Sequence, residues 1–251
     1  MDTLDTNQNT PAADDGALRS AEPTPARFHW HWSDLLIFIG MSFFSQVVTL
    51  FLLSLVSPAF SPVSEAILSL GGLVGSVYLL GWRRKRQSWV AVGMRRVSGR
   101  WVGAAIGLGL ILPIVDGFIE YGLQVLMGHL GVHPQPVQAP DSSLVSSIGF
   151  LLSIWIVAPL AEEVFFRGVL YTLVRERWGV WIGVIVSSLV FAVGHLSVPL
   201  AVPAFILGCL SALLYERTRS LWPSLIIHCL NNAGTLLTYL LLVVILKLPL
   251  R

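Results

Sequence analysis

Charged residues are scarce in this chain of 251 residues: they make up 12% of it, while hydrophobic residues make up 55%. Soluble domains carry roughly a quarter of charged residues, and a soluble fold of this size has too little interior to hide so much apolar surface. The formal net charge of +2 is too small to indicate a nucleic-acid partner. The scarcity of charge therefore argues against a soluble domain and predicts a multi-pass protein of the cell membrane, with the lipid bilayer as a partner.

Cysteine and the common catalytic signatures are also rare or absent. The two cysteines, Cys209 and Cys229, fall inside apolar runs, where packing residues are more common than a disulfide or a metal pair. The chain contains no His-Glu-x-x-His, no Gly-x-Ser-x-Gly and no glycine-rich phosphate loop. The usual zinc-peptidase, serine-hydrolase and nucleotide-binding motifs therefore do not explain its function.

Long apolar stretches dominate the sequence instead. A bilayer crossing takes about 20 helical residues, so the pattern predicts an all-α, polytopic transmembrane helical bundle of about seven to eight helices. The stretches recur at about 34–57, 63–82, 101–127, 145–176, 181–196, 201–215 and 221–246.

Basic residues are unevenly distributed between these stretches. They crowd the segment 83–100 and recur at 175–177 and 217–219, whereas 58–62 and 128–144 contain no Lys or Arg. Because cytoplasmic loops carry the excess of Lys and Arg, the amino terminus is predicted to be cytoplasmic.

The run from Leu144 to Glu176 is too long for one straight crossing. About 32 residues of helix would reach about 48 Å across a hydrocarbon core of roughly 30 Å. Pro159 has no backbone N–H and suits the first turn of a helix. We therefore expect a helix to about Val157, a break, and a new helix from Pro159.

Three polar clusters lie inside these apolar runs. Ionisable groups at membrane depth cost at least a few kcal/mol each, so they are functional candidates by default. A single cluster has a structural explanation, as an ion pair or hydrogen bond that joins two helices. Three on separate helices predict one pocket. The clusters are Glu162, Glu163 and Arg167; Phe191 and His195; His228 and Asn232, with Asn231 as an alternative on a neighbouring face.

The chemistry open to such a pocket is limited. A carboxylate in a dry site can act as general base toward water, and imidazole and carboxamide groups can stabilise an oxyanion. Glu162, His195 and His228 could also hold a catalytic zinc ion. We expect no cofactor to be required, because Asn is an uncommon zinc ligand, but the residues leave metal dependence open.

The two glutamates differ in their expected roles. Glu163 and Arg167 are four residues apart, acid first, which favours an ion pair. Glu162 lies about 100° away around the helix and has Phe166, an apolar residue, one turn further on. Glu162 is therefore expected to be the general base, and Glu163 a structural partner of Arg167.

The clusters resemble the signature of the CAAX-processing and bacteriocin-processing (Abi) family of intramembrane endopeptidases. That signature reads Glu-Glu-x-x-x-Arg, then Phe-x-x-x-His, then His-x-x-x-Asn or Asp on successive helices, and this chain matches it over about 145–240. The resemblance implies that glutamate-activated water hydrolyses a peptide bond in a membrane-associated peptide or protein, prenylated CAAX-type substrates included. It implies Glu162 as base, His195 as water ligand, and His228 and Asn232 at the oxyanion; Glu163, Arg167 and Phe191 support them.

Composition and apolar runs, together with the resemblance for the core, divide the chain into parts. We expect a disordered cytoplasmic tail (1–30), N-terminal transmembrane helices (31–140), a protease-like core (141–246) and a short tail (247–251). Two other functions remain open: a non-catalytic peptide-binding or bacteriocin-immunity protein on the same scaffold, and a transporter that binds a cation at a broken helix. A plain ladder of helices also leaves His195 at a different depth from Glu162.

Overall fold

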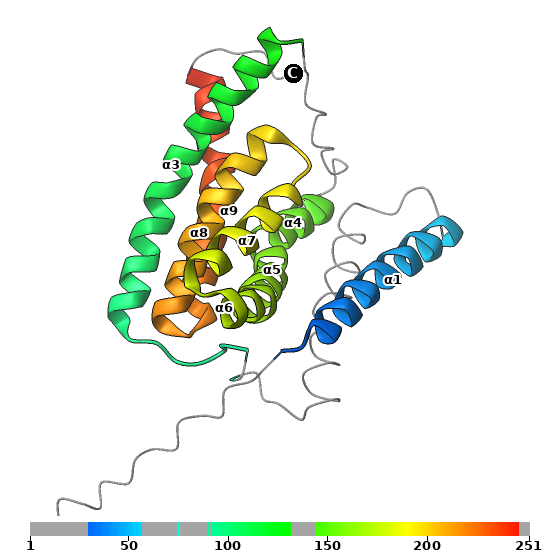
Figure 1. The fold of residues 1–251 in the computed structure, drawn as a ribbon. Helices are drawn as coiled ribbons and strands as arrows, with labels where there is room; N and C mark the ends of the chain where they lie inside the picture. Colours follow the sequence, from blue (N-terminus) through cyan, green and yellow to red (C-terminus); the bar gives the residue numbers. More distant parts are fainter. Residues whose placement is uncertain (1–29, 57–74, 76–89, 91, 132–143, 246–251) are drawn as a thin grey trace, which may run out of the picture.

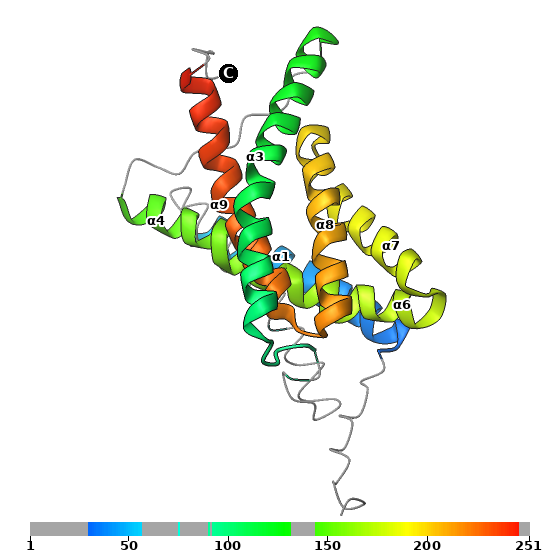
Figure 2. The same ribbon diagram turned by 90° about the vertical axis from the view of Figure 1, so that its left-hand side faces the viewer.

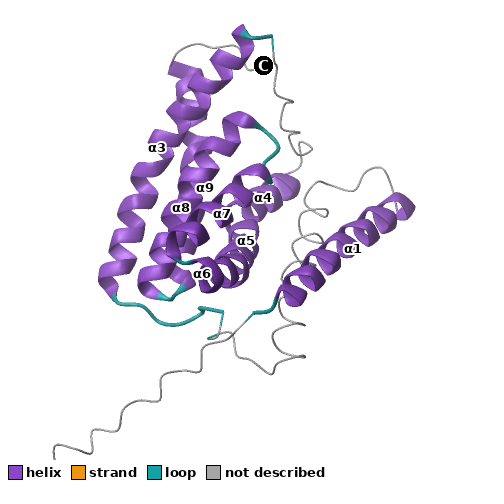
Figure 3. Ribbon diagram, viewed as in Figure 1, coloured by secondary structure: helices purple, strands orange, loops and turns teal. Residues whose placement is uncertain are grey.

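The computed structural model describes residues 30–56, 75, 90, 92–131 and 144–245. The expected tails at 1–30 and 247–251 and the apolar stretch at 63–82 fall almost entirely outside these residues. Within them every regular element is a helix (Figure 3), so the predicted all-α class is confirmed for this part of the chain.

The described residues form six continuous helices. Three of them, Gly99–His129, Ser147–Trp178 and Val198–Thr218, are long and apolar enough to cross a membrane, so the expected number of seven to eight helices is not reached in the described part. In chain order the elements are α1 (Trp32–Val56), α3 (Gly99–His129), α4 (Leu144–Leu152), η3 (Ser153–Val157), α5 (Ala158–Glu163), η4 (Val164–Tyr171), α6 (Thr172–Trp178), α7 (Val180–Val193), α8 (Val198–Thr218) and α9 (Leu221–Ile245).

The expected break before Pro159 is wrong, because α4, η3, α5, η4 and α6 follow one another without interruption. The segment η3, directly before Pro159, is a π-helix, and the N–H of Ala158 bonds to the carbonyl of Ser153, five residues back. A π turn widens the helix locally, which relieves the clash between a proline ring and the preceding turn. The helix therefore continues through the proline rather than ending at it.

Helices α3 and α9 run side by side and in the same direction (Figures 1 and 2). Glycines allow this close approach: a Cβ at Gly109 would lie 2.8 Å from Leu230, and one at Gly117 would lie 2.7 Å from Thr238. On the other helix, a Cβ at Gly234 would lie 2.6 Å from Pro113. The side chains of Leu230, Thr238 and Pro113 therefore pack directly onto the glycines of the facing helix, and small residues permit such close approach in membrane helices.

The continuous helix from α4 to α6 is steeply inclined to α3, α8 and α9 (Figure 2). It ends at Gly179, whose φ of 89° is a left-handed conformation that glycine adopts without strain. Helix α7 then returns along α6, so closely that a Cβ at Gly183 would lie 2.9 Å from the side chain of Arg175. Glu163 lies sixteen residues before Gly179 and His195 sixteen after it, so this helical hairpin brings both to the same level.

The first part of α1 packs against the same inclined helix. The ring of Phe38 stacks on Phe165 with centroids 4.5 Å apart, and Trp30 Nε1 donates a hydrogen bond of 2.9 Å to the carbonyl of Gly168. Further along, Phe43, Phe44 and Phe51 are exposed. The contacts of Phe38 and Trp30 with the helix that carries the glutamates thus lie at the beginning of α1 and just before it.

Candidate active site

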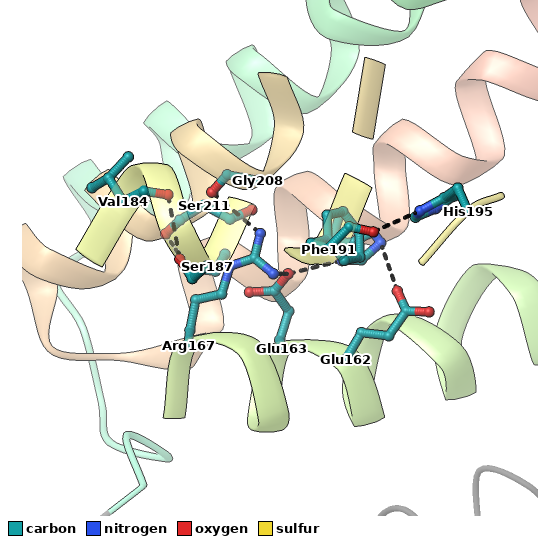
Figure 4. Close-up of polar contacts among 11 residues, drawn as sticks. Glu162, Glu163, Arg167, Val184, Ser187, Phe191, His195, Gly208 and Ser211 are labelled. Carbon is teal, nitrogen blue, oxygen red and sulfur yellow. Dashed lines mark hydrogen bonds and ion pairs between the residues drawn. The ribbon is translucent and has the colours of Figure 1, made fainter. Parts of the chain in front are cut away.

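A buried ion pair anchors the polar site to the inclined helix (Figure 4). Arg167 Nη1 lies 3.1 Å from Glu163 Oε1, and both side chains are only 1% exposed. The Arg167 Nη2 group also donates to the carbonyl of Gly208 in α8, at 3.3 Å. The ion pair that the four-residue spacing predicts is therefore confirmed, and it ties this helix to α8.

His228 of α9 lies between the two glutamates. Its Nδ1 is 2.8 Å from Glu163 Oε1, and its Nε2 is 3.4 Å from Glu162 Oε2. Because Arg167 pairs with the Glu163 carboxylate, the short Nδ1 contact is best satisfied by an N–H that donates to that carboxylate. The other imidazole nitrogen is then directed at Glu162.

The two glutamates differ sharply in their access to the surroundings. The Glu162 side chain is 29% exposed, whereas that of Glu163 is 1% exposed. Glu163 has His228 and Arg167 as partners, so its charge is compensated where water cannot reach it. Glu162 is the carboxylate of the pair that an external water molecule or peptide can approach.

The aromatic ring of Phe191 contacts both histidines. Its centroid lies 4.9 Å from that of His195 and 5.5 Å from that of His228, with both imidazoles nearly perpendicular to it. The Nδ1 of His195 is 3.0 Å from the carbonyl oxygen of Phe191. Among the described residues, no hydrogen bond or ion pair joins His195 to Glu162 or His228. His195 is thus joined to His228 through ring contacts with Phe191 and not through a hydrogen bond.

The hydrogen bond of Asn232 depends on the proline in the inclined helix. Its Nδ2 donates a hydrogen bond of 2.9 Å to the carbonyl of Ile154. In the π pattern that links Ala158 to Ser153, the next N–H would belong to residue 159 and would bond to Ile154, but Pro159 has none. The Asn232 carboxamide supplies the missing donor and still has a second N–H.

Asn231, the alternative to Asn232, has a different partner. Its Nδ2 donates to Asp116 Oδ2 of α3 at 2.9 Å, on the face of α9 that packs against α3. Asp116 is fully buried in α3, and Glu120 lies one turn further along the same helix. Our sequence reasoning missed both acids. The signal was present, since each is an ionisable residue within a predicted crossing.

The side chains do not gather as a three-ligand metal site. His195 packs against the Phe191 ring, and its Nδ1 is engaged by the carbonyl of Phe191. Within the part of the chain that the structure describes, no group of three His, Cys, Asp or Glu side chains is arranged to hold a metal ion. The geometry of Glu162, His195 and His228 thus does not match a zinc centre with three protein ligands.

Comparison with known proteins points to the segment that carries all three polar clusters. Residues 144–234 match the family described as "Type II CAAX prenyl endopeptidase Rce1-like". The "Uncharacterized 24.3 kDa protein" of Escherichia coli is 31% identical over 129 residues, which are 47% of this chain and 55% of that protein. The "Putative membrane peptidase YdiL" of Bacillus subtilis (strain 168) is 24% identical over 135 residues, or 51% and 55%.

The chain spans about half the length of these curated relatives, and no solved structure matches it. The family match begins where α4 begins and ends within α9, so it includes both glutamates, Arg167, both histidines and Asn232. Residues 144–234 of this chain are thus similar to the Rce1-like family of type II CAAX prenyl endopeptidases.

Proposed function

We propose that this protein is an intramembrane endopeptidase in which Glu162 activates water to hydrolyse a peptide bond in a membrane-associated substrate. The observation that carries the proposal is the position of His228 between the accessible Glu162 and the buried Glu163, which is paired with Arg167. The family match and the name of the Bacillus subtilis relative support a peptidase.

The charges around His228 suggest its protonation state. Two carboxylates, Glu162 and Glu163, surround it, and Arg167 balances one of them. An imidazolium at His228 balances the other, so that the site as a whole is neutral, as a low-dielectric environment favours. One N–H of His228 is then fixed on Glu163, and the other is directed at Glu162 and the space above it.

The proposed reaction begins with a water molecule between Glu162 and His195. Because His195 Nδ1 bonds to the Phe191 carbonyl, its Nε2 can accept one hydrogen of this water, while Glu162 takes the other proton as general base. The water oxygen attacks the peptide carbonyl carbon. The oxyanion that forms is stabilised by the Nε2–H of His228 and the second N–H of Asn232.

The second half of the reaction returns the proton. Collapse of the tetrahedral intermediate breaks the carbon–nitrogen bond, and Glu162 gives its proton to the leaving amine. Glu162 is a carboxylate again once the products leave, so no covalent enzyme intermediate forms. We propose membrane-bound peptides, including prenylated CAAX-type carboxyl termini, as the substrate class, on the strength of the family description.

Cleavage of a peptide panel by the purified protein tests the function. The panel contains matched prenylated and unprenylated peptides, and products are identified by mass spectrometry. We expect cleavage by the wild-type protein and a loss of roughly 100-fold or more for Glu162→Gln, the range of general-base catalysis. Glu162→Gln should fold normally, because its side chain is partly exposed.

Glu120→Gln is the matched control, since it removes a carboxylate from another membrane helix without touching the site. It should cleave like the wild type. Cleavage by Glu162→Gln at the wild-type rate would place the base elsewhere. Binding of panel peptides by the wild type without any turnover would instead favour a non-catalytic peptide-binding protein.

A further inference from the structure

A buried acid–amide pair lies in the seam between α3 and α9. Asp116 is 0% exposed and Asn231 is 5% exposed, and Asn231 Nδ2 donates to Asp116 Oδ2 at 2.9 Å. The glycine contacts along the seam are made to Leu230, Pro113 and the methyl group of Thr238. Burying a carboxyl group in such surroundings costs free energy unless a hydrogen-bond partner compensates it.

Each member of the pair has one oxygen without a hydrogen-bond partner. Asp116 Oδ1 and Asn231 Oδ1 are both inaccessible, and neither receives a donor. Within the described residues no basic side chain forms an ion pair with Asp116. An ionised Asp116 would therefore leave a negative charge in an apolar seam, together with an unsatisfied amide oxygen.

One proton on Asp116 would remove both defects. A carboxylic acid has one O–H donor and one acceptor oxygen, which match the acceptor and donor of a carboxamide. Asn231 already donates to Oδ2, and a proton on Oδ1 would give Asp116 the donor that the unpartnered Asn231 Oδ1 needs to close a ring of two hydrogen bonds. A neutral Asp116 also avoids repulsion with Glu120, which lies four residues further along α3 and accepts a hydrogen bond from Gln124.

We propose that Asp116 holds a proton at neutral pH and forms with Asn231 a closed acid–amide pair that positions α9 for the active site. The positioning part rests on the proposed function. Asn231 directly precedes Asn232 and lies three residues after His228, but it occupies the face of α9 that packs on α3. A rotation of α9 about its axis would move all three side chains together.

The seam by itself does not define this rotation well. Glycine contacts at Gly109, Gly117 and Gly234 let the helices approach, but they are made to backbone and aliphatic groups without directional bonds. A pair of antiparallel donor–acceptor bonds is directional. The pair therefore fixes α9 on one side, while the Asn232 bond to Ile154 and the His228 bond to Glu163 fix the opposite side.

Infrared spectroscopy tests the protonation directly and needs no enzymatic activity. At neutral pH the difference spectrum between wild type and Asp116→Asn should contain the C=O stretching band of a protonated carboxylic acid, which shifts in D₂O. The same band should persist in Glu120→Gln. A carboxylate band in its place, with no carboxylic acid band, would overturn the proposal.

Substitutions then test whether the pair positions α9. Asp116→Asn puts two carboxamides face to face and should retain stability and cleavage, whereas Asp116→Leu strands Asn231 and should lower both. The double variant Asp116→Leu/Asn231→Leu removes both polar groups and should recover stability. Its kcat should nevertheless stay low, by up to about 100-fold, as small misplacements of catalytic groups produce.

The labelling rate of Cys229 by a thiol reagent, in a Cys209→Ala background, reports the rotation of α9 without any need for cleavage. We expect the wild-type rate in Asp116→Asn and a rate changed several-fold in the double variant. A double variant that labels and cleaves like the wild type would refute positioning, as would an Asp116→Asn variant as impaired as Asp116→Leu. A wild-type protein that cleaves nothing would contradict the proposed function. The infrared and labelling results would then still decide whether Asp116 and Asn231 form the acid–amide pair.

Discussion

Replacement of Glu163 by glutamine should destabilise the protein far more than the same replacement at Glu162. Glu163 is fully buried and contacts Arg167 at 3.1 Å and His228 at 2.8 Å. Glu163→Gln leaves the guanidinium without its counter-charge, and breaking one side of a buried pair costs about 3–5 kcal/mol. At about 2–4 °C per kcal/mol for a chain of this size, Tm should fall by about 6–20 °C.

The matched change at Glu162 gives the reference. Its side chain is 29% exposed, and His228, unlike Arg167, can release its proton when Glu162 becomes neutral. Changes at accessible sites usually stay within about 0.5 kcal/mol, so Tm should move by no more than about 2 °C. Thermal unfolding of both variants in the same detergent, followed by tryptophan fluorescence, measures the contrast. Peptide cleavage measured on the same samples separates loss of fold from loss of chemistry.

A double variant identifies the cause of the instability. If Glu163→Gln is unstable because Arg167 is stranded, then Glu163→Gln/Arg167→Met should recover much of the lost Tm, since buried ion pairs are often replaceable by apolar groups of similar volume. A Glu163→Gln protein that melts within about 2 °C of the wild type would refute this reasoning, because the ion pair would then add little to the stability of the fold.

Three further changes test other parts of the structure. Pro159→Ala restores a backbone N–H that competes with Asn232 for the carbonyl of Ile154. We therefore expect kcat to fall by up to about 100-fold while Tm stays level or rises. An unchanged kcat in peptide cleavage would contradict the role of the proline. Gly234→Ala forces a Cβ to 2.6 Å from Pro113 and should lower stability by about 1–3 kcal/mol. Gly122→Ala is the control, because its Cβ meets nothing within 4 Å, and it should leave stability unchanged. Equal Tm values for the two variants would show that α3 and α9 can move apart at little cost in free energy. Cleavage should withstand a strong chelator, and a loss of activity that zinc restores would instead establish a metal enzyme.

Local patterns in the sequence predicted the features that depend on neighbours along the chain. Apolar runs located α1, α3, α7, α8 and α9 to within a few residues, because helix length and apolar character follow from the bilayer. The Glu163–Arg167 pair followed from its spacing in the same way. These features need no knowledge of how the helices pack.

Contacts between distant segments could not be read from such patterns. The bond of His228 to Glu163 joins residues 65 positions apart, and that of Asn231 to Asp116 joins residues 115 apart. The prediction of a break at Pro159 failed because the proline's missing donor is supplied from another helix, by Asn232. His195 lies at the level of the glutamates because α7 turns back at Gly179 along the inclined helix. The predicted ladder, in which each apolar run crosses the whole bilayer, places His195 at a different depth.

The contacts of α1 with the inclined helix set the size of the smallest fragment that can be expected to fold. Similarity to the family starts at residue 144, but Phe38 and Trp30 cover Phe165 and Gly168 on the helix that holds the glutamates. Gly109 and Pro113 of α3 fill the other side of α9 in the same way. A fragment trimmed to the region of similarity would expose both surfaces, so expression trials should keep the chain from about residue 30 onward.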